Sequence, residues 1–384
     1  MKKLLPLFLN ESFRGVAISL LTLFSAVYIY NILLVFSYSP KIALAGTVFF
    51  YLVTEFFKFW ANFLAKYLSL KYGLKVPIYL GEIFFIICLL TLFFFKDPIF
   101  LVFIAPLFLG ISTGLYWFGR HGLMAKIGSF HHFGNELGMN GIVNTILLMI
   151  TPIFGGFLIS NIGYRSLFLV SLLFVVCSML FLRESEEQKI VHDTNLSEIL
   201  QLFKNHPRMF LAYAGNAASA TVYAIIFPLY IYLLVKKEFS LGEFFTSAMI
   251  LSALVNLLIG RFMDLKGKKE MILIGSLVSS VIWLGRFIFR NIPALFSLDI
   301  VDRLTGGMTG IPFSALSYQK AVHGHATGRA ILFRELAVGI GAMSACLIMI
   351  GIIFSGFGLE LTFIMAGIFS LTQLLVIKGE NLDD

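Results

Sequence analysis

The chain has 384 residues, of which 59% are hydrophobic and only 13% charged, with a formal net charge of +8 at pH 7. Soluble domains carry about 25% charged residues, so the composition excludes a protein that exposes most of its surface to water. The positive charge does not indicate nucleic-acid binding, because the basic residues are spread over short segments between apolar runs. Anionic lipid headgroups are the expected partner.

The apolar runs are long enough for membrane-spanning helices, which need about 20 residues each. Helices are expected because every backbone polar group in lipid has to be bonded within its own segment. The breaks at charges, Gly and Pro predict twelve spans, at residues 15–37, 42–64, 76–95, 98–119, 136–160, 163–182, 209–235, 241–262, 271–289, 293–316, 328–353 and 359–377. The predicted fold class is therefore an all-α polytopic membrane protein.

A polar stretch after the sixth span divides the chain into two halves. It predicts an N-terminal six-helix bundle at 1–182, a cytoplasmic linker at 183–208 and a C-terminal six-helix bundle at 209–384. The segment SEILQLF in the linker is expected to form an amphipathic helix on the membrane surface. GISTG in span four and GGMTG in span ten occupy matching places, which favours a parallel internal duplication.

The distribution of basic residues predicts the orientation. Most of the 29 Lys and Arg residues lie in the even-numbered connections and at the two chain ends. The positive-inside rule places that side in the cytoplasm. We therefore expect a cytoplasmic (inner) membrane protein with both termini inside, and a retained N-terminus, because the apolar stretch in MKKLLPLFLN is too short for a signal peptide.

Three short motifs stand out from the apolar background. GRFMDLKGKK follows the spacing G-x-x-x-D-[RK]-x-G-[RK]-[RK], with its defining residues at Gly260, Asp264, Gly267, Lys268 and Lys269. RLTGG, which begins at Arg303, has the form R-x-x-x-G, and TPIFGGFLISNIGYRSLF at 151–168 contains P-x-x-G-G. Together these motifs resemble those of the major facilitator superfamily (MFS) over essentially the whole chain. The first-half loop AKYLSLKYGLK lacks the Gly and the Asp of the motif, and the R-x-x-x-G motif stands in span ten instead of span four.

The resemblance implies two six-helix bundles around a cavity at the membrane midplane. In the family the loop motif is a latch that holds the inward gate. Gly260 would let two helices approach closely, Gly267 would permit a tight reversal, and Asp264 would accept hydrogen bonds from the N-terminus of a neighbouring helix. The alternative is an ordinary basic cytoplasmic loop.

The segment DIVDRLTGG places three charges inside span ten. At about 1.5 Å per residue from Pro293, Asp302 lies about 14 Å into the hydrocarbon core, near its midplane. Asp299 and Arg303 are separated by one turn and can form an ion pair. Two interpretations stay open. Either the pair only holds the helix in place, or Arg303 contributes to coupling or substrate contact while Asp302 takes up a proton because burial disfavours its ionised form.

A second set of charges lies at similar depth in spans two, three and eleven, namely Glu55, Glu82 and Arg334. We expect Glu55 and Arg334 to pair between the two halves, with Lys58 and Glu335 nearby. The alternative is that Lys58 snorkels to the interface and that the other groups bond within their own half.

Other polar groups have weaker assignments. Arg286, near the outer end of span nine, is expected to be a snorkelling anchor. Tyr116, Trp117 and Arg120 end span four and form either an interfacial belt and anchor or part of a gate or cavity wall. The His residues after spans four and ten are expected to be solvated loop residues, at 121, 131, 132, 323 and 325. Tyr223 in span seven is a possible cavity wall.

These features favour a secondary active transporter that moves a small solute by alternating access. Nucleotide-binding and hydrolase motifs are absent from the sequence, so we expect neither an enzyme nor a cofactor or metal. Asp302, Glu55 and Glu82 favour proton coupling, and the few charges slightly favour export. We expect a monomer. The alternative is an MFS-fold protein that no longer transports and binds a lipid or a protein partner, which the incomplete first-half loop motif favours.

Overall fold

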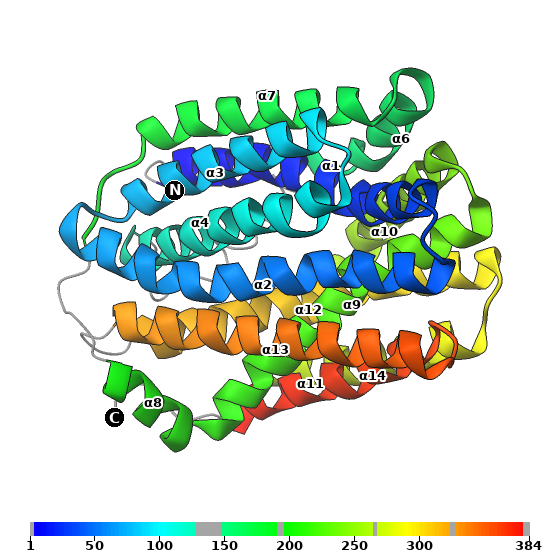
Figure 1. The fold of residues 1–384 in the computed structure, drawn as a ribbon. Helices are drawn as coiled ribbons and strands as arrows, with labels where there is room; N and C mark the ends of the chain where they lie inside the picture. The colour runs from blue at the N-terminus through cyan, green and yellow to red at the C-terminus, as the bar shows by residue number, and fades with distance from the viewer. Residues whose placement is uncertain (1–3, 128–146, 190–195, 264–266, 323–326, 379–384) are drawn as a thin grey trace.

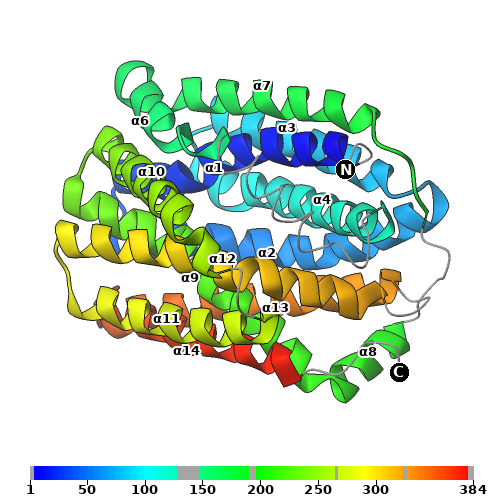
Figure 2. The ribbon, with the colours of Figure 1, turned by 180° about the vertical axis from the view of Figure 1, so that it is seen from behind.

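The computed structural model describes residues 4–127, 147–189, 196–263, 267–322 and 327–378. All the regular structure in these ranges is helical, and the long helices run roughly side by side across the molecule (Figures 1 and 2). The first half contains α1 (Leu5–Val35), α2 (Pro40–Lys71), α3 (Lys75–Phe94), the π-helical turn η1 (Phe100–Ile104), α4 (Ala105–Ile127), α6 (Thr151–Ile162) and α7 (Tyr164–Arg183).

The short helix α8 (Leu196–Asn205) precedes the second half. The second half contains α9 (Pro207–Val235), α10 (Glu238–Met263), α11 (Lys268–Ile288), α12 (Ile292–Val322), α13 (Thr327–Ser355), α14 (Leu361–Leu371) and the 3-10 segment η2 (Thr372–Lys378). The amphipathic helix predicted in the linker is present as α8, with Ile199 and Leu202 buried.

The two halves pack their helices in the same pattern. In the first half α2 lies against α4, α3 lies against α4 and α7, and α1 lies against α7. In the second half α10 lies against α12, α11 lies against α12 and α14, and α9 lies against α14 and η2. The fold is therefore two pseudo-symmetric helical bundles, as the sequence predicts. The bundles meet along α2 with α13, α6 with α10, and α1 with α9.

The glycines of the GISTG segment allow α4 to pack closely against α2. A Cβ atom at Gly114 would lie 2.6 Å from the carbonyl oxygen of Lys58, and one at Gly110 would lie 2.9 Å from Cβ of Phe57. Both distances are shorter than van der Waals contact, so only glycine permits this packing. The contact aligns the turn of α2 around Thr54 and Lys58 with the turn of α4 around Thr113.

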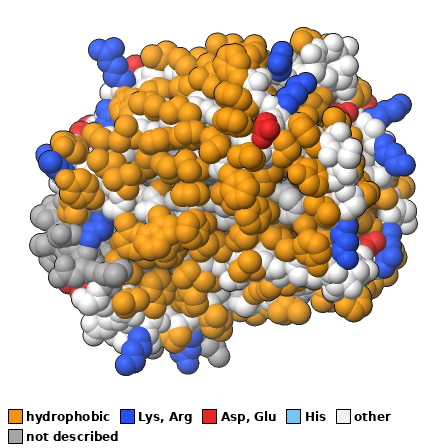
Figure 3. Space-filling model, in the orientation of Figure 1, with side chains coloured by type: hydrophobic (Ala, Val, Ile, Leu, Met, Phe, Trp, Pro, Cys, Tyr) orange, Lys and Arg blue, Asp and Glu red, His pale blue; other side chains and the backbone are white. Residues whose placement is uncertain are grey.

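The molecular surface matches a lipid environment. Figure 3 shows hydrophobic side chains over the middle of one face, with most Lys and Arg side chains toward its margins. Large apolar residues of α2 are exposed, including Phe56 and Trp60. In the described residues, eight helices are long and apolar enough to cross a membrane. The remaining predicted spans correspond to the shorter apolar helices α6 and α14 and to the long helices α10 and α12.

Helix α1 begins earlier than predicted. The predicted span starts at residue 15, whereas α1 starts at Leu5 and carries Asn10, Ser12 and Arg14 as buried polar residues. The polar stretch NESFR therefore does not end the helix, because its side chains are bonded inside the bundle. This extension brings two further charged side chains, Glu11 and Arg14, to the candidate site.

Candidate functional site: a cavity between the bundles and two ionic networks

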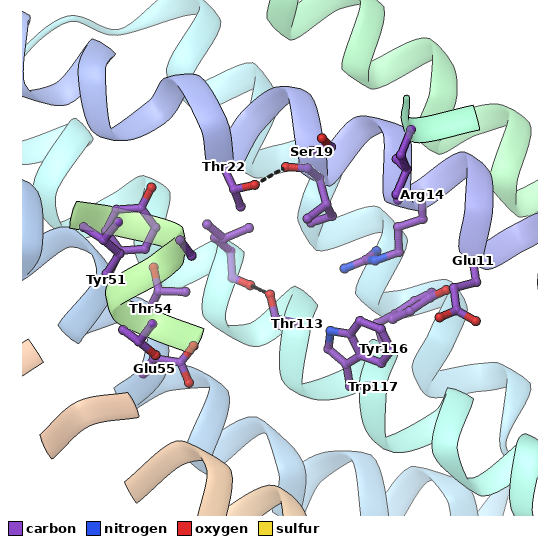
Figure 4. Close-up of a pocket in the computed structure, with 17 residues that line it drawn as sticks. Glu11, Arg14, Ser19, Thr22, Tyr51, Thr54, Glu55, Thr113, Tyr116 and Trp117 are labelled. Carbon is purple, nitrogen blue, oxygen red and sulfur yellow. Dashed lines mark hydrogen bonds between the residues drawn. The ribbon is translucent and has the colours of Figure 1, made fainter. Parts of the chain in front are cut away.

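A cavity of about 460 Å³ lies between the two bundles. Its walls come from α1, α2 and α4 of the first bundle and from α9 of the second bundle, with Leu148 at one side. Figure 4 shows the polar part of the wall, formed by Glu11, Arg14, Ser19, Thr22, Tyr51, Thr54, Glu55, Thr113, Tyr116 and Trp117. Thr221, Ala224 and Ile225 of α9 complete it. We call this space the central cavity.

At one end of the molecule the bundles are held together by direct contacts. This end carries the turns α1–α2, α6–α7, α9–α10 and α13–α14, and lies opposite the N-terminus and α8 (Figure 1). Asn31 Nδ2 donates to Tyr232 Oη at 2.9 Å, which joins α1 to α9. Lys41 Nζ donates to the carbonyl oxygen of Phe354 at 2.8 Å, which joins α2 to α13.

The same end is closed further by two glycines on facing helices. A Cβ atom at Gly156 of α6 would lie 2.7 Å from the carbonyl oxygen of Glu238, and one at Gly242 of α10 would lie 3.0 Å from Cα of Ile153. The helices α6 and α10 are thus in backbone contact, which a larger residue at either glycine would prevent.

The first ionic network is buried in the first bundle beside the central cavity. Arg14 Nη1 lies 2.6 Å from Glu82 Oε2, and Arg14 Nη2 donates to Ser112 Oγ at 2.9 Å. The Arg14 guanidinium also lies over the ring of Tyr116, with its carbon 3.9 Å from the ring centroid. The other oxygen of Glu82 accepts from Ser178 Oγ at 3.0 Å.

Glu82 is a predicted site residue, whereas the predicted start of span one at residue 15 leaves Arg14 outside the span, in the cytoplasmic end of the chain. That placement is wrong, because Arg14 is 2% exposed and occupies the wall of the central cavity. The error comes from the start assigned to span one. The signal that could have found it is a single long helix from Leu5, in which Arg14 shares a face with apolar residues such as Leu7 and Leu21, both buried.

The end of α4 forms a second group of polar contacts. Arg120 Nη2 and Nε donate to Glu11 Oε2 at 2.5 and 3.0 Å. Trp117 lines the central cavity and stacks on the His121 ring, with centroids 5.3 Å apart. Arg120 and His121 are 3% and 7% exposed, so neither is an interfacial anchor or a solvated loop residue. The four other His residues grouped with His121 lie outside the described residues.

The predicted ion pair between Glu55 and Arg334 is wrong. Glu55 Oε2 lies 2.9 Å from Lys58 Nζ on its own helix, and Arg334 Nη1 lies 2.8 Å from Glu335 Oε1. The two pairs nevertheless lie near each other, because the charges of Arg334 and Glu335 both act on Lys58. Each pair lies within its own bundle, as the alternative interpretation expected, but Lys58 is 8% exposed and pairs with Glu55, so its expected snorkelling to the interface is wrong.

A side-chain contact between the bundles is present in this region. His121 Nε2 lies 3.4 Å from Glu335 Oε1, which joins α4 to α13.

The second ionic network lies in the C-terminal bundle. Arg303 Nε lies 2.8 Å from Asp299 Oδ2, so the predicted pair within span ten is present. Arg286 Nη2 contacts both acids, at 3.1 Å from Asp299 Oδ1 and 2.9 Å from Asp302 Oδ2. Tyr223 Oη donates to Asp299 Oδ1 at 3.0 Å and accepts from Arg303 Nη2 at 2.9 Å. Two arginines thus balance two aspartates.

The assignment of Arg286 as a snorkelling anchor is wrong. Its side chain is 0% exposed and its guanidinium lies 4.2 Å from the ring centroid of Phe227 and 4.5 Å from that of Trp283. Aromatic rings attract cations through their negative faces, so they support a buried guanidinium whose Nε and Nη1 have no hydrogen-bond partner among the described residues. Arg286 and Asp299 are 13 residues apart on two helices joined by a short turn. Helices joined in this way run antiparallel, and this spacing is the signal that the two side chains could meet.

A second cavity of about 380 Å³ adjoins this network inside the C-terminal bundle. Asp302, Arg303 and Tyr223 line it, together with the motif residues Gly306 and Gly310. Of the predicted site residues, Glu55, Tyr116 and Trp117 line the central cavity, and Asp302 and Arg303 line the second cavity. Five further predicted site residues line neither cavity, so any role in solute binding would be exerted through their partners: Asp299, Glu82, Arg120, Arg334 and Glu335.

The gating-loop motif is only partly visible. Asp264 lies outside the described residues, and the side chain of Lys268 is likewise not described. Gly260 is in the last turns of α10, Gly267 precedes α11 with an extended backbone (φ −68°, ψ 153°), and Lys269 is exposed. The latch role stays a prediction. Among the described residues, no group of three or more His, Cys, Asp or Glu could hold a metal ion.

The helices and the inter-bundle cavity define a polytopic membrane protein of two pseudo-symmetric bundles, the architecture of a membrane transporter. A family model described as "Major Facilitator Superfamily" matches residues 13–242. The chain therefore belongs to the major facilitator superfamily, as its motifs suggested.

Solved transporter structures share the fold. The human organic anion transporter MFSD10 (TETRAN) superposes with a TM-score of 0.73 at 11% identity, covering 98% of both chains. The POT family transporter PepTSo superposes with a TM-score of 0.69 at 9% identity, covering 98% of this chain and 97% of that one. A POT family transporter in complex with 5-aminolevulinic acid gives 0.67 at 11% identity, with 98% and 95% covered. Comparison with curated proteins found no match.

Proposed function

We propose that the protein is a secondary active transporter that moves a small solute through the central cavity by alternating access. The observation that carries the proposal is the position of the cavity, with α1, α2 and α4 of one bundle facing α9 of the other. A solute bound there touches both bundles, so rocking of one bundle against the other would change the side from which it is reached. A volume of about 460 Å³ suits a drug-sized solute.

The proposed state and orientation follow from the inter-bundle contacts. The end joined by the α6–α10 glycines and by Asn31 with Tyr232 would be the outer end. The end carrying the N-terminus and α8 would face the cytoplasm, because the basic residues gather there. The protein would then lie in the cytoplasmic membrane as a monomer with bundles 1–182 and 209–384, the central cavity closed to the outside.

Proton coupling is proposed for Asp302. This carboxylate is 19% exposed, lines the second cavity and shares Arg286 with the fully buried Asp299. If Asp302 takes up a proton, Arg286 keeps Asp299 as its counter-ion, so one charge can change without unpairing the guanidinium. Export of an amphipathic compound is the direction we propose, since the cavity wall is mostly apolar apart from a few charges.

The test is solute flux in proteoliposomes with an imposed pH gradient. Purified protein is first screened for solutes that raise its thermal stability, because a ligand that binds the native state stabilises it. We expect accumulation of a stabilising solute against its concentration gradient, collapsing when the pH gradient is removed. Binding without flux, with or without the gradient, would instead favour the alternative, a non-transporting MFS protein that binds a lipid or partner.

A further inference from the structure

The threonine hydroxyls that face the central cavity share one bonding pattern. Each donates its proton to the backbone carbonyl four residues earlier, at 2.6 to 3.0 Å, and they are Thr22, Thr54, Thr113 and Thr221. A hydroxyl carries a single proton and two acceptor lone pairs. These four groups therefore offer a ligand acceptors only.

Arg14, the cation of the cavity wall, is held by partners of its own bundle. Arg14 donates to Glu82 and Ser112, and its planar face is stacked on Tyr116. Tyr116 Oη in turn donates to Asn10 Oδ1 at 3.0 Å. The positive charge of Arg14 is thus balanced by the buried carboxylate of Glu82, which does not line the cavity.

Negative charge at the wall comes from Glu11 and Glu55. Both are ion-paired on one oxygen, Oε2, with Arg120 and Lys58 respectively, and neither cation lines the cavity. The side chain of Glu55 is 17% exposed, and its Oε1 has no hydrogen-bond partner among the described residues. Thr54 is the next residue along the helix, and Thr113 lies on the turn of α4 that packs against it (Figure 4).

The rest of the wall is apolar or aromatic. Ile18, Leu109 and Ile225 form part of it, and Trp117 presents its indole to the same space (Figure 4). Ser19 and the Trp117 N–H add neutral polar groups. An apolar body would bury its surface against these side chains, while a cationic head would be attracted to an aromatic ring or a carboxylate.

We infer that the transported solute is an amphipathic cation, with an apolar or aromatic body and a protonated amine head that binds Glu55, Thr54 and Thr113. The inference rests on the proposed transport function of the central cavity. A primary ammonium has three N–H donors and no acceptor, which matches one carboxylate oxygen and two hydroxyl oxygens. A carboxylate or phosphate head would instead meet threonine hydroxyls whose protons are already donated to backbone carbonyls, and two negative side chains.

The test compares three probes with one aromatic body and different heads: naphthylethylamine, naphthylethanol and naphthylacetate. Binding to the purified full-length protein in detergent is measured by isothermal titration calorimetry at pH 7. We expect the ammonium to bind about tenfold more tightly than the alcohol, because a charge-assisted hydrogen bond exceeds a neutral one by about that ratio, and the anion to bind most weakly. Naphthylacetate binding as tightly as the amine, or no binding by any probe, would overturn the inference.

Variants assign the preference to Glu55. Glu55→Gln should weaken amine binding about tenfold and leave alcohol binding unchanged, whereas Glu55→Asp should keep the preference for the amine. Glu243→Gln, at an exposed acid of α10, is the matched control and should change neither. An unchanged amine-to-alcohol ratio in Glu55→Gln would refute the assignment.

Flux measurements separate this inference from the proposed function. Selective amine binding without flux in proteoliposomes would refute transport and leave the cationic preference standing. Flux of naphthylacetate in place of the amine would refute the preference and leave transport standing.

Discussion

Arg14 Nη1 lies 2.6 Å from Glu82 Oε2, and this ion pair fixes α1 against α3 beside the central cavity. The side chains are 3% and 0% exposed, so both charges are shielded from bulk water. Removing one member of such a pair leaves an uncompensated buried charge.

We expect Glu82→Leu to lower the free energy of unfolding by about 3–5 kcal/mol, measured by denaturation in detergent. The double variant Arg14→Met with Glu82→Leu should recover most of that loss, since it leaves no charge unpaired. Glu243→Leu, at an exposed acid of α10, serves as the control and should unfold like the parent. Equal stability of the Glu82 variant and this control would contradict the account of a buried pair.

The two aspartates of the C-terminal network should differ when each is changed to asparagine. Asp299 is 0% exposed and contacts Arg286, Arg303 and Tyr223, so Asp299→Asn should cost about 3–5 kcal/mol in stability. Asp302 has one arginine partner and lines a cavity. We expect Asp302→Asn to fold and to exchange solute at equal pH, but to lose accumulation driven by a pH gradient.

The measurements are thermal unfolding in detergent for both variants, and two flux assays for Asp302→Asn. If this variant still accumulates solute with the parent's pH dependence, Asp302 is not the coupling residue. Loss of both accumulation and exchange, in a protein with parental stability, would place Asp302 in solute binding instead.

Contacts that one helix determines could be predicted from the sequence. Asp299 and Arg303 are one turn apart, so their pairing follows from helical geometry alone. Contacts that depend on the rotation of a helix about its axis could not be predicted in this way. Glu55 and Arg334 lie at similar depth, but depth does not fix which way each side chain points, and each found a partner on its own helix.

The fold itself could be predicted because each span is marked by the hydropathy and length of its own segment. The arginines that complete both networks could not. Arg286 reaches Asp299 and Asp302 on the next helix, and Arg14 reaches Glu82 on α3. Each is a contact between helices, and each arginine had been placed near a membrane interface because span ends were set from charge. Ending a span at its first charged residue gives the wrong boundary when the helix is longer and its polar residues are buried.

The glycine contact between α6 and α10 should control access from the outer side. In Gly156→Leu the new side chain would meet the backbone of Glu238 and Phe239, where a Cβ atom alone already lies within 3.0 Å of Phe239 Cα. We expect the outer ends of the bundles to separate. The change is measured as faster labelling of Thr22→Cys, in the cavity wall, by a membrane-impermeant maleimide added outside.

The labelling is done in a background in which the three native cysteines, Cys88, Cys177 and Cys346, are replaced by serine or alanine. Gly351→Leu is the matched control, because nothing lies within 4 Å of a Cβ atom at that position of α13. An equal labelling rate in Gly156→Leu and Gly351→Leu would show that the α6–α10 contact does not close the cavity.

Exchange of charges distinguishes the pairing that the structure contains from the one that depth alone predicts. Glu55→Lys places two lysines one turn apart on α2, and like charges at this spacing repel. Adding Lys58→Glu restores an attractive pair at the same two positions, so the double variant should regain much of the stability lost in the single one. Adding Arg334→Glu to Glu55→Lys should not, because Arg334 pairs with Glu335 and would be replaced by a second acid beside it. Thermal unfolding in detergent ranks the variants, and a rescue by Arg334→Glu that exceeds the rescue by Lys58→Glu would show that the bundles pair across their interface after all.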